Sequence, residues 1–125
     1  MRETATSAIP MEALGLYRLA VAATPGAEIK ANFGFPYTAV NGNMHSFLDK
    51  SGTFALRLTA LDRIAFCNAF GGTPYVHETG TVLNEYLAVP FEVLANTDLA
   101  VAWLGRSLDY ARTLKPKPVA GRAAA

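Results

Sequence analysis

The chain has a single cysteine, Cys67, among its 125 residues. One thiol cannot form an internal disulfide, which is typical of a protein from a reducing compartment, so we expect a cytoplasmic location. No apolar run approaches the ~20 residues that a membrane-spanning helix needs. The apolar stretch 13–23 contains Arg18 and follows Glu3 and Glu12, where a secretory signal carries positive charge, so we interpret it as a helix that stays on the protein.

Charged residues are also scarce, at 17% of the chain, whereas hydrophobic residues make up 51%. This length fits one domain with a proper core, and the composition leaves apolar side chains available for a partner surface. The net charge of +1 argues against a general electrostatic attraction to nucleic acid. The basic residues nevertheless gather near the C-terminal end, where the candidate nucleic-acid contacts are Arg106, Arg112, Lys115 and Lys117.

Histidine is rare, and neither His45 nor His77 stands at a spacing typical of metal ligands. We expect His45 on the surface of a strand and His77 near a turn. Cys67 lies in an apolar helical segment, and buried cysteine is usually inert. No serine-nucleophile motif is present, and Gly71-Gly72 closes a helix where a phosphate-binding loop would open one. The sequence therefore predicts no catalytic residue, no metal site and no cofactor, and hence no enzyme.

The pattern of apolar residues, turns and caps predicts an α+β domain with an antiparallel sheet. Asn41-Gly42 indicates a tight turn inside a three-stranded meander, because both central residues of a type I′ turn need positive φ. Thr59 and Asp62 resemble a capping box, which predicts a short helix that Gly71 ends. The expected elements are a helix over 11–23, strands over 33–40, 44–48 and 54–58, that short helix, strands over 73–77 and 82–89, and a helix from about 97 to 113.

Prolines set the expected limits of the domain. Pro10 suits the first turn of a helix, whereas Pro116 and Pro118 cannot continue one. We therefore predict a domain over 10–115, with 1–9 and 116–125 as flexible termini.

Two helices differ in their apolar surface. The first is apolar almost all round, which is typical of a helix packed on two sides or placed at an interface. Its candidate interface residues are Leu14, Tyr17 and Val21. The last helix has one apolar side, so half of it is expected to be buried. That side is centred on Leu99 and Trp103 and includes Tyr110, Leu114, Leu104, Leu108 and Ala111.

The ordered segments together resemble the TfoX (Sxy) N-terminal domain family over roughly residues 11–118. The segments that carry the resemblance are Phe33-Gly34-Phe35-Pro36-Tyr37, Val40-Asn41-Gly42-Asn43-Met44, Phe54-Ala55-Leu56-Arg57-Leu58, Leu61-Asp62-Arg63, Asn84-Glu85-Tyr86, Val89-Pro90, Ala102-Trp103-Leu104 and 108–112. The resemblance implies a two-layer α-β(3)-α-β(2)-α sandwich similar to secretion chaperones. It also implies a bacterial cytoplasmic protein without accepted catalytic or cofactor residues.

The name-giving members of that family are competence regulators with a second, helical domain. We expect this chain to be a stand-alone single-domain member, to which the competence role does not automatically extend. The leading hypothesis is a non-enzymatic regulatory or protein-interaction module that forms a homodimer. Two alternatives remain open: a nucleic-acid-associated regulator that uses the basic C-terminal end, and a small-ligand-binding domain. For the second alternative, the polar groups to inspect are His45, His77 and Glu85.

Overall fold

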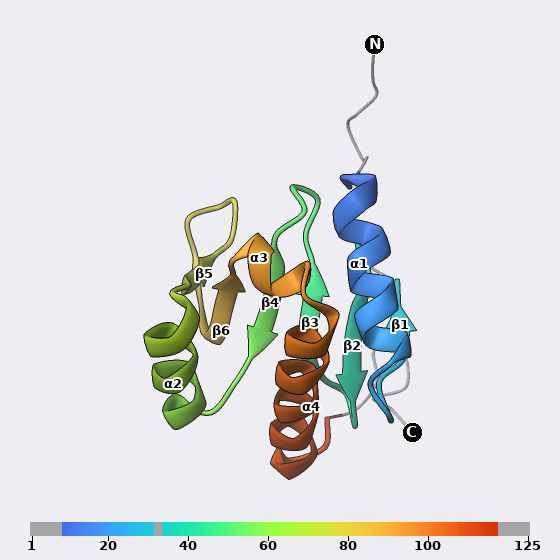
Figure 1. The fold of residues 1–125 in the computed structure, drawn as a ribbon. Coiled ribbons are helices and arrows are strands. Elements are labelled where there is room, and N and C mark those ends of the chain that lie inside the picture. Colours follow the sequence, from blue (N-terminus) through green and yellow to red (C-terminus); the bar gives the residue numbers. More distant parts are fainter. Residues whose placement is uncertain (1–8, 32–33, 118–125) are drawn as a thin grey trace.

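The computed structural model describes residues 9–31 and 34–117, and within them it has four helices and one six-stranded antiparallel sheet (Figure 1). The α+β class predicted from the sequence is therefore confirmed. The helices are α1 (Met11–Ala22), α2 (Ala60–Phe70), α3 (Phe91–Leu94) and α4 (Thr97–Thr113). The strands are β1 (Ile29–Lys30), β2 (Tyr37–Val40), β3 (Asn43–Leu48), β4 (Phe54–Arg57), β5 (Thr73–Val76) and β6 (Val82–Val89).

The sheet has the order β1-β2-β3-β4-β6-β5, and the helices lie against one of its faces (Figure 1). Two short elements, β1 and α3, were not predicted, because two and four residues carry too little periodicity. The strand expected over 33–40 begins only at Tyr37, since Gly34 at φ 83° and Pro36 bend the chain before it. Phe33, also part of that prediction, lies outside the described residues.

Local turn and cap signals give two correct predictions, and a third cap begins the last helix. Asn41 and Gly42 have φ values of 53° and 81°, as the turn between β2 and β3 requires. The Thr59 hydroxyl accepts a hydrogen bond from the Asp62 amide at 3.1 Å and caps α2. The Asn96 side chain caps α4 by accepting from the Leu99 amide at 3.2 Å.

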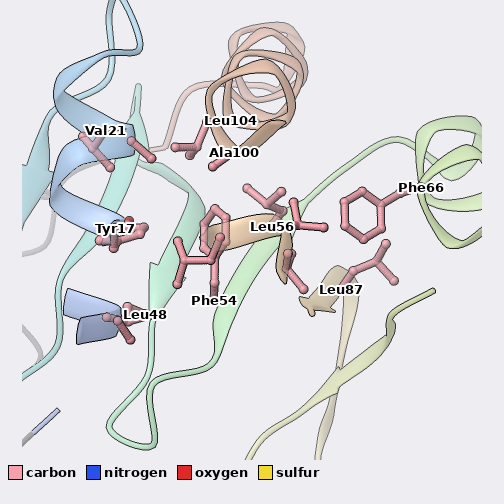
Figure 2. Packing of buried hydrophobic residues seen from close by; sticks show 14 of the residues in the cluster. Tyr17, Val21, Leu48, Phe54, Leu56, Phe66, Leu87, Ala100 and Leu104 are labelled. Carbon is pink, nitrogen blue, oxygen red and sulfur yellow. The ribbon is translucent and has the colours of Figure 1, made fainter. Parts of the chain in front are cut away.

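The main core lies between the helices and the sheet (Figure 2). Each of the three longer helices contributes side chains to it, and Figure 2 shows them directed at the same sheet face. Burial of these apolar groups contributes most of the free energy that holds the two layers together. The members of the core that Figure 2 labels are Tyr17 and Val21 from α1, Phe66 from α2, Ala100 and Leu104 from α4, and Leu48, Phe54, Leu56 and Leu87 from the sheet.

The predicted interface on α1 is wrong for two of its three residues. Tyr17 and Val21 are buried inside the domain, and Leu14 is half-buried. Tyr17 packs edge-on against Phe54, with ring centroids 5.6 Å apart, so its side chain is unavailable to a partner. A helix that looks apolar all round thus uses one side for the core of its own domain.

The buried side of α4 is rotated from the predicted one. Ala100, Leu104 and Leu108 face the core, whereas Leu99 and Trp103 are half-buried at its flank. Trp103 is displaced to the flank because it packs against Phe66 of α2, edge-on at 5.1 Å. The tryptophan therefore joins two helices instead of filling the centre of the core.

The segment after α4 is attached to the turn between β2 and β3. The Lys117 amide donates to the Asn41 carbonyl at 2.8 Å, and the buried Asn43 side chain donates to the Lys115 carbonyl at 3.0 Å. The predicted flexible C-terminal end stays a prediction: residues 116–117 belong to this attached segment, while 1–8 and 118–125 lie outside the described residues.

Replacing Gly42 tests this attachment. A Cβ at Gly42 would overlap the Lys117 carbonyl oxygen, and its φ of 81° is unfavourable for alanine. Gly80→Ala is the matched control, because Gly80 has φ 93° but a Cβ there meets no atom of the described residues within 4 Å. In urea denaturation we expect Gly80→Ala to cost about 1–2 kcal/mol of unfolding free energy from strain alone. We expect Gly42→Ala to cost about 1 kcal/mol more, from loss of the Lys117 hydrogen bond. Equal losses would contradict the attachment.

Candidate functional site

A buried polar network lies where α1 and α4 meet β2 and β3. It centres on His45, the extra residue of a bulge, because β3 has one residue more than β2 between the pairs Thr38–Ser46 and Ala39–Met44. The bulge turns the imidazole toward Ser107 of α4, at 3.1 Å from Nδ1. The prediction of His45 on a strand surface is therefore wrong, since its side chain is fully buried.

The hydrogen bonds of Ser107 favour one tautomer of His45, and Thr38 Oγ1 lies 3.3 Å from the same Nδ1. Ser107 Oγ donates its proton to the His45 carbonyl at 2.7 Å, so it accepts from Nδ1–H. Nε2 then carries a lone pair, and it has no hydrogen-bond partner in the described part of the chain. Burial, and secondarily the charge of Arg112, lower the pKa of His45 to about 4. The imidazole is therefore a neutral structural group near pH 7.

Hydroxyl groups extend the network toward α1. Thr38 Oγ1 lies 2.5 Å from Ser46 Oγ, which lies 2.8 Å from the Tyr17 hydroxyl. Burial raises the pKa of Tyr17 well above its usual value. The network thus joins two helices to two strands through neutral groups. Within the described part of the chain, its side-chain hydrogen bonds run between its own members and leave His45 Nε2 unpaired.

The three polar residues suggested for a ligand site do not form one. His45 bonds within the core, whereas His77 is exposed and bonds to Thr79 in the turn after β5, near a turn as expected. Glu85 bonds to Arg57 and Tyr110 at another end of the sheet. Each of the three side chains has partners of its own. The residues suggested from the sequence therefore do not come together as a ligand site.

Glu85 instead anchors a compact polar cluster in the middle of β6. Its φ of 75° is rare for a residue with a side chain. Its carboxylate accepts from Tyr110 at 2.5 Å and from Arg57 at 2.8 Å, and the Arg57 guanidinium also lies 5.8 Å from the Tyr86 ring. The hydrogen bond from Tyr110, and secondly the bond and charge of Arg57, lower the pKa of Glu85 against the effect of burial. The strained residue thus connects β6 to the C-terminal half of α4.

The four candidate nucleic-acid contacts are divided between two sides of α4. Arg106 faces α2, where it pairs with Asp62 at 3.1 Å and lies over the Trp103 ring at 5.0 Å. Arg112 pairs with Asp109 at 3.6 Å, and its guanidinium reaches Gly26 in the loop after α1. The remaining two, Lys115 and Lys117, are exposed in the segment after α4. These four residues do not form one continuous basic surface. Nucleic-acid binding therefore stays a prediction.

An apolar groove lies between α2 and the β5–β6 hairpin. It has a volume of about 560 Å³, with Ile64 and Cys67 of α2 on one wall. Val82 and Leu83 of β6 lie on the other wall, and Glu85 stands at its polar end. Cys67 is only half-buried here, so its predicted full burial is wrong.

The face of α2 beside this groove is exposed and apolar. Leu61 and Ile64 are 79% and 59% exposed, and Val82 across the groove is 51% exposed. Phe66 is the only residue of α2 that is fully buried. The sequence pattern predicts a short helix here but does not predict which of its sides is exposed. The spacing of the apolar residues does not reveal that Phe66 is the one fully buried residue of this helix, with Cys67 and Phe70 partly buried beside it.

We name this surface the α2 face, and it contains no charged side chain among its exposed members. Asp62 and Arg63, the charged residues of α2, are half-buried and bond to Arg106 and to the Leu58 carbonyl. An uncharged apolar strip beside a groove is the surface pattern expected of a protein contact. The exposed members of the α2 face are Ala60, Leu61, Ile64, Ala65, Asn68 and Ala69 of the helix and Val82 of the hairpin.

No protein-family model, no curated protein and no solved structure matches this chain. The likenesses to the TfoX N-terminal domain and to secretion chaperones therefore stay predictions. None of the helices in the described residues has the length and apolar character that crossing a membrane requires. Within 9–31 and 34–117, no three His, Cys, Asp or Glu side chains come together as a metal site.

Proposed function

We propose that this protein is a non-enzymatic interaction module that pairs with a second copy of itself through the α2 face. The observation that carries the proposal is the exposure of Leu61 and Ile64 beside an apolar groove. Water-exposed leucine and isoleucine on a well-packed domain are stabilised when a partner covers them.

We favour a second copy of this chain as the partner because the α2 face has both a protruding side chain and a groove that can receive one. Leu61 protrudes at one end of the helix, and the groove lined by Ile64 and Val82 runs alongside it. A two-fold axis requires such self-complementarity, since each copy must supply what the other accepts. The absence of exposed charge among the described residues of this face also removes the repulsion that like charges would create across the axis.

The size of the surface sets the strength of the pairing. A helix of 11 residues is about 16 Å long, so helix and groove together offer on the order of 300 Å² per copy. A standard interface buries roughly 800 Å² per partner. We therefore expect a weak, reversible dimer that forms at high local concentration, as suits a regulatory module.

Leu61→Asp tests the pairing. Leu61 is the second residue of α2, where an acidic side chain interacts favourably with the helix dipole, so the fold is retained. Two leucines leave the interface per dimer, at about 1.5–3 kcal/mol each, so dimerisation weakens on the order of 100-fold or more. Sedimentation equilibrium measures the dissociation constant.

Leu19→Asp is the matched control, because Leu19 is similarly exposed but lies on α1. We expect it to dimerise like the wild type. Equal effects of both substitutions, or none from Leu61→Asp, would contradict pairing through the α2 face. The proposal extends to a bacterial cytoplasmic setting and a regulatory role, which the TfoX-like segments support.

A further inference from the structure

The sheet is rolled toward the face that carries no helix. Tyr75 of β5 donates a hydrogen bond to Asp49, in the turn between β3 and β4, at 2.7 Å. Strands β4 and β6 lie between β3 and β5 in the sheet, so this bond forms only because the outer strands curve over. The helix-free face is therefore concave.

Aromatic rings form the floor of this concavity. Phe47 and Tyr75 meet at 90° with centroids 4.9 Å apart, and Phe35 lies 5.6 Å from Phe47. Phe47 and Tyr75 are only 4% and 7% exposed, although no helix residue belongs to this second core cluster. The rolled strands thus hold the rings in fixed positions.

A pocket of about 700 Å³ opens above these rings. Its apolar lining includes Met44, Leu83 and Ala88 in addition to the three rings. Ligand sites are typically clefts of roughly 300–1,000 Å³ with apolar walls and a few placed polar groups. The pocket has the size and the lining of a small-molecule site.

Two carboxylates give the mouth of the pocket a negative character. Asp49 and Glu78 both line it, and neither has an ion-pair partner in the described part of the chain. Burial first, then the bond and charge of Asp49 and the charge of Glu78, raise the pKa of Tyr75, which lies at the floor of the pocket. Lys50 is the one cation of the lining, and His77 completes the rim.

We infer that this pocket binds a small organic cation, a protonated or quaternary amine with an apolar or aromatic body. The negative faces of aromatic rings attract such cations, and the energy rises when water is excluded. The two carboxylates outnumber Lys50 at the mouth, so a cation is attracted and an anion of the same shape is disfavoured. The apolar body of the ligand packs on the aromatic rings at the floor of the pocket.

A matched pair of probes tests this site: benzyltrimethylammonium, a cation with an aromatic body, and phenylacetate, an anion of similar size. Titrations are followed by amide NMR shifts on the Leu61→Asp variant, so that self-association of the α2 face does not affect the result. We expect shifts at β3, β5 and the end of β6, and at least roughly tenfold weaker binding of the anion, as about 1.4 kcal/mol of charge preference implies.

Glu78→Gln separates charge from shape. Glu78 is exposed, so the fold is retained, and we expect cation affinity to fall by about threefold to tenfold, as removal of one nearby charge predicts. Glu92→Gln, an exposed acid on α3 outside the pocket, leaves the affinity unchanged. Equal binding of cation and anion, shifts elsewhere, or no binding of the cation would overturn the inference and leave the proposed dimer untouched.

Discussion

Phe66→Ala is expected to destabilise the domain by about 3–5 kcal/mol, the usual cost of removing a buried aromatic side chain. Phe66 is the one fully buried residue of α2, and it packs against Trp103 and Phe70 at 5.1 Å from each ring. Its replacement removes the ring that α2 directs toward Leu56 and Leu87 of the sheet (Figure 2), and so leaves a cavity there. Urea denaturation measures the loss in unfolding free energy.

Ile64→Ala provides the comparison on the same helix. Ile64 is exposed on the α2 face, so its truncation changes unfolding free energy by no more than about 0.5 kcal/mol. Amide hydrogen exchange adds a local readout, since Phe66→Ala releases α2 first and its amides lose protection before those of α4. A loss below about 1 kcal/mol in Phe66→Ala would contradict the role of this ring as the attachment of α2.

Acid is expected to destabilise the domain through His45. Its pKa is about 4 in the folded protein and 6.5 in the unfolded chain, so the unfolded state binds the proton more readily. The contribution of neutral His45 to the free energy of unfolding is fully present above pH 6.5 and is lost as the pH falls toward 4. The difference between the two pKa values corresponds to about 3 kcal/mol.

His45→Asn isolates this contribution. The asparagine amide can donate to Ser107 as Nδ1–H does, but it does not titrate. We expect the variant to be less stable at pH 7 and to lose less further stability down to pH 4 than the wild type. His77→Asn, which replaces an exposed histidine in a turn, should follow the wild-type profile. Parallel pH profiles for wild type and His45→Asn would contradict the assignment.

Helix-capping residues and turn residues, which determine the conformation of the backbone beside them, made most of the fold predictable from the sequence. Thr59 and Asn96 mark helix starts by capping, and Asn41-Gly42 marks a hairpin by its positive φ values. Such signals depend on a few adjacent residues, so one sequence contains them. The bounds of β6 and α4 followed for the same reason, because Pro90 stops the strand and Asn96 starts the helix.

The candidate sites were less predictable because they depend on contacts between distant segments. The burial of His45 results from a bulge against β2, and a bulge is a property of two paired strands. The exposure of Leu61 depends on which side of α2 meets Trp103, which helical spacing does not specify. The aromatic pocket arises from the rolling of the sheet, which brings Tyr75 to Asp49.

We propose that an exposed apolar helix face makes this domain an interaction module. Sedimentation velocity of the wild-type chain from about 1 µM to about 1 mM, the range in which free energies of roughly 4–8 kcal/mol are detected, tests it most directly. The weight-average mass is predicted to rise from that of one chain toward that of two. A mass that stays at one chain throughout this range would contradict pairing through the α2 face.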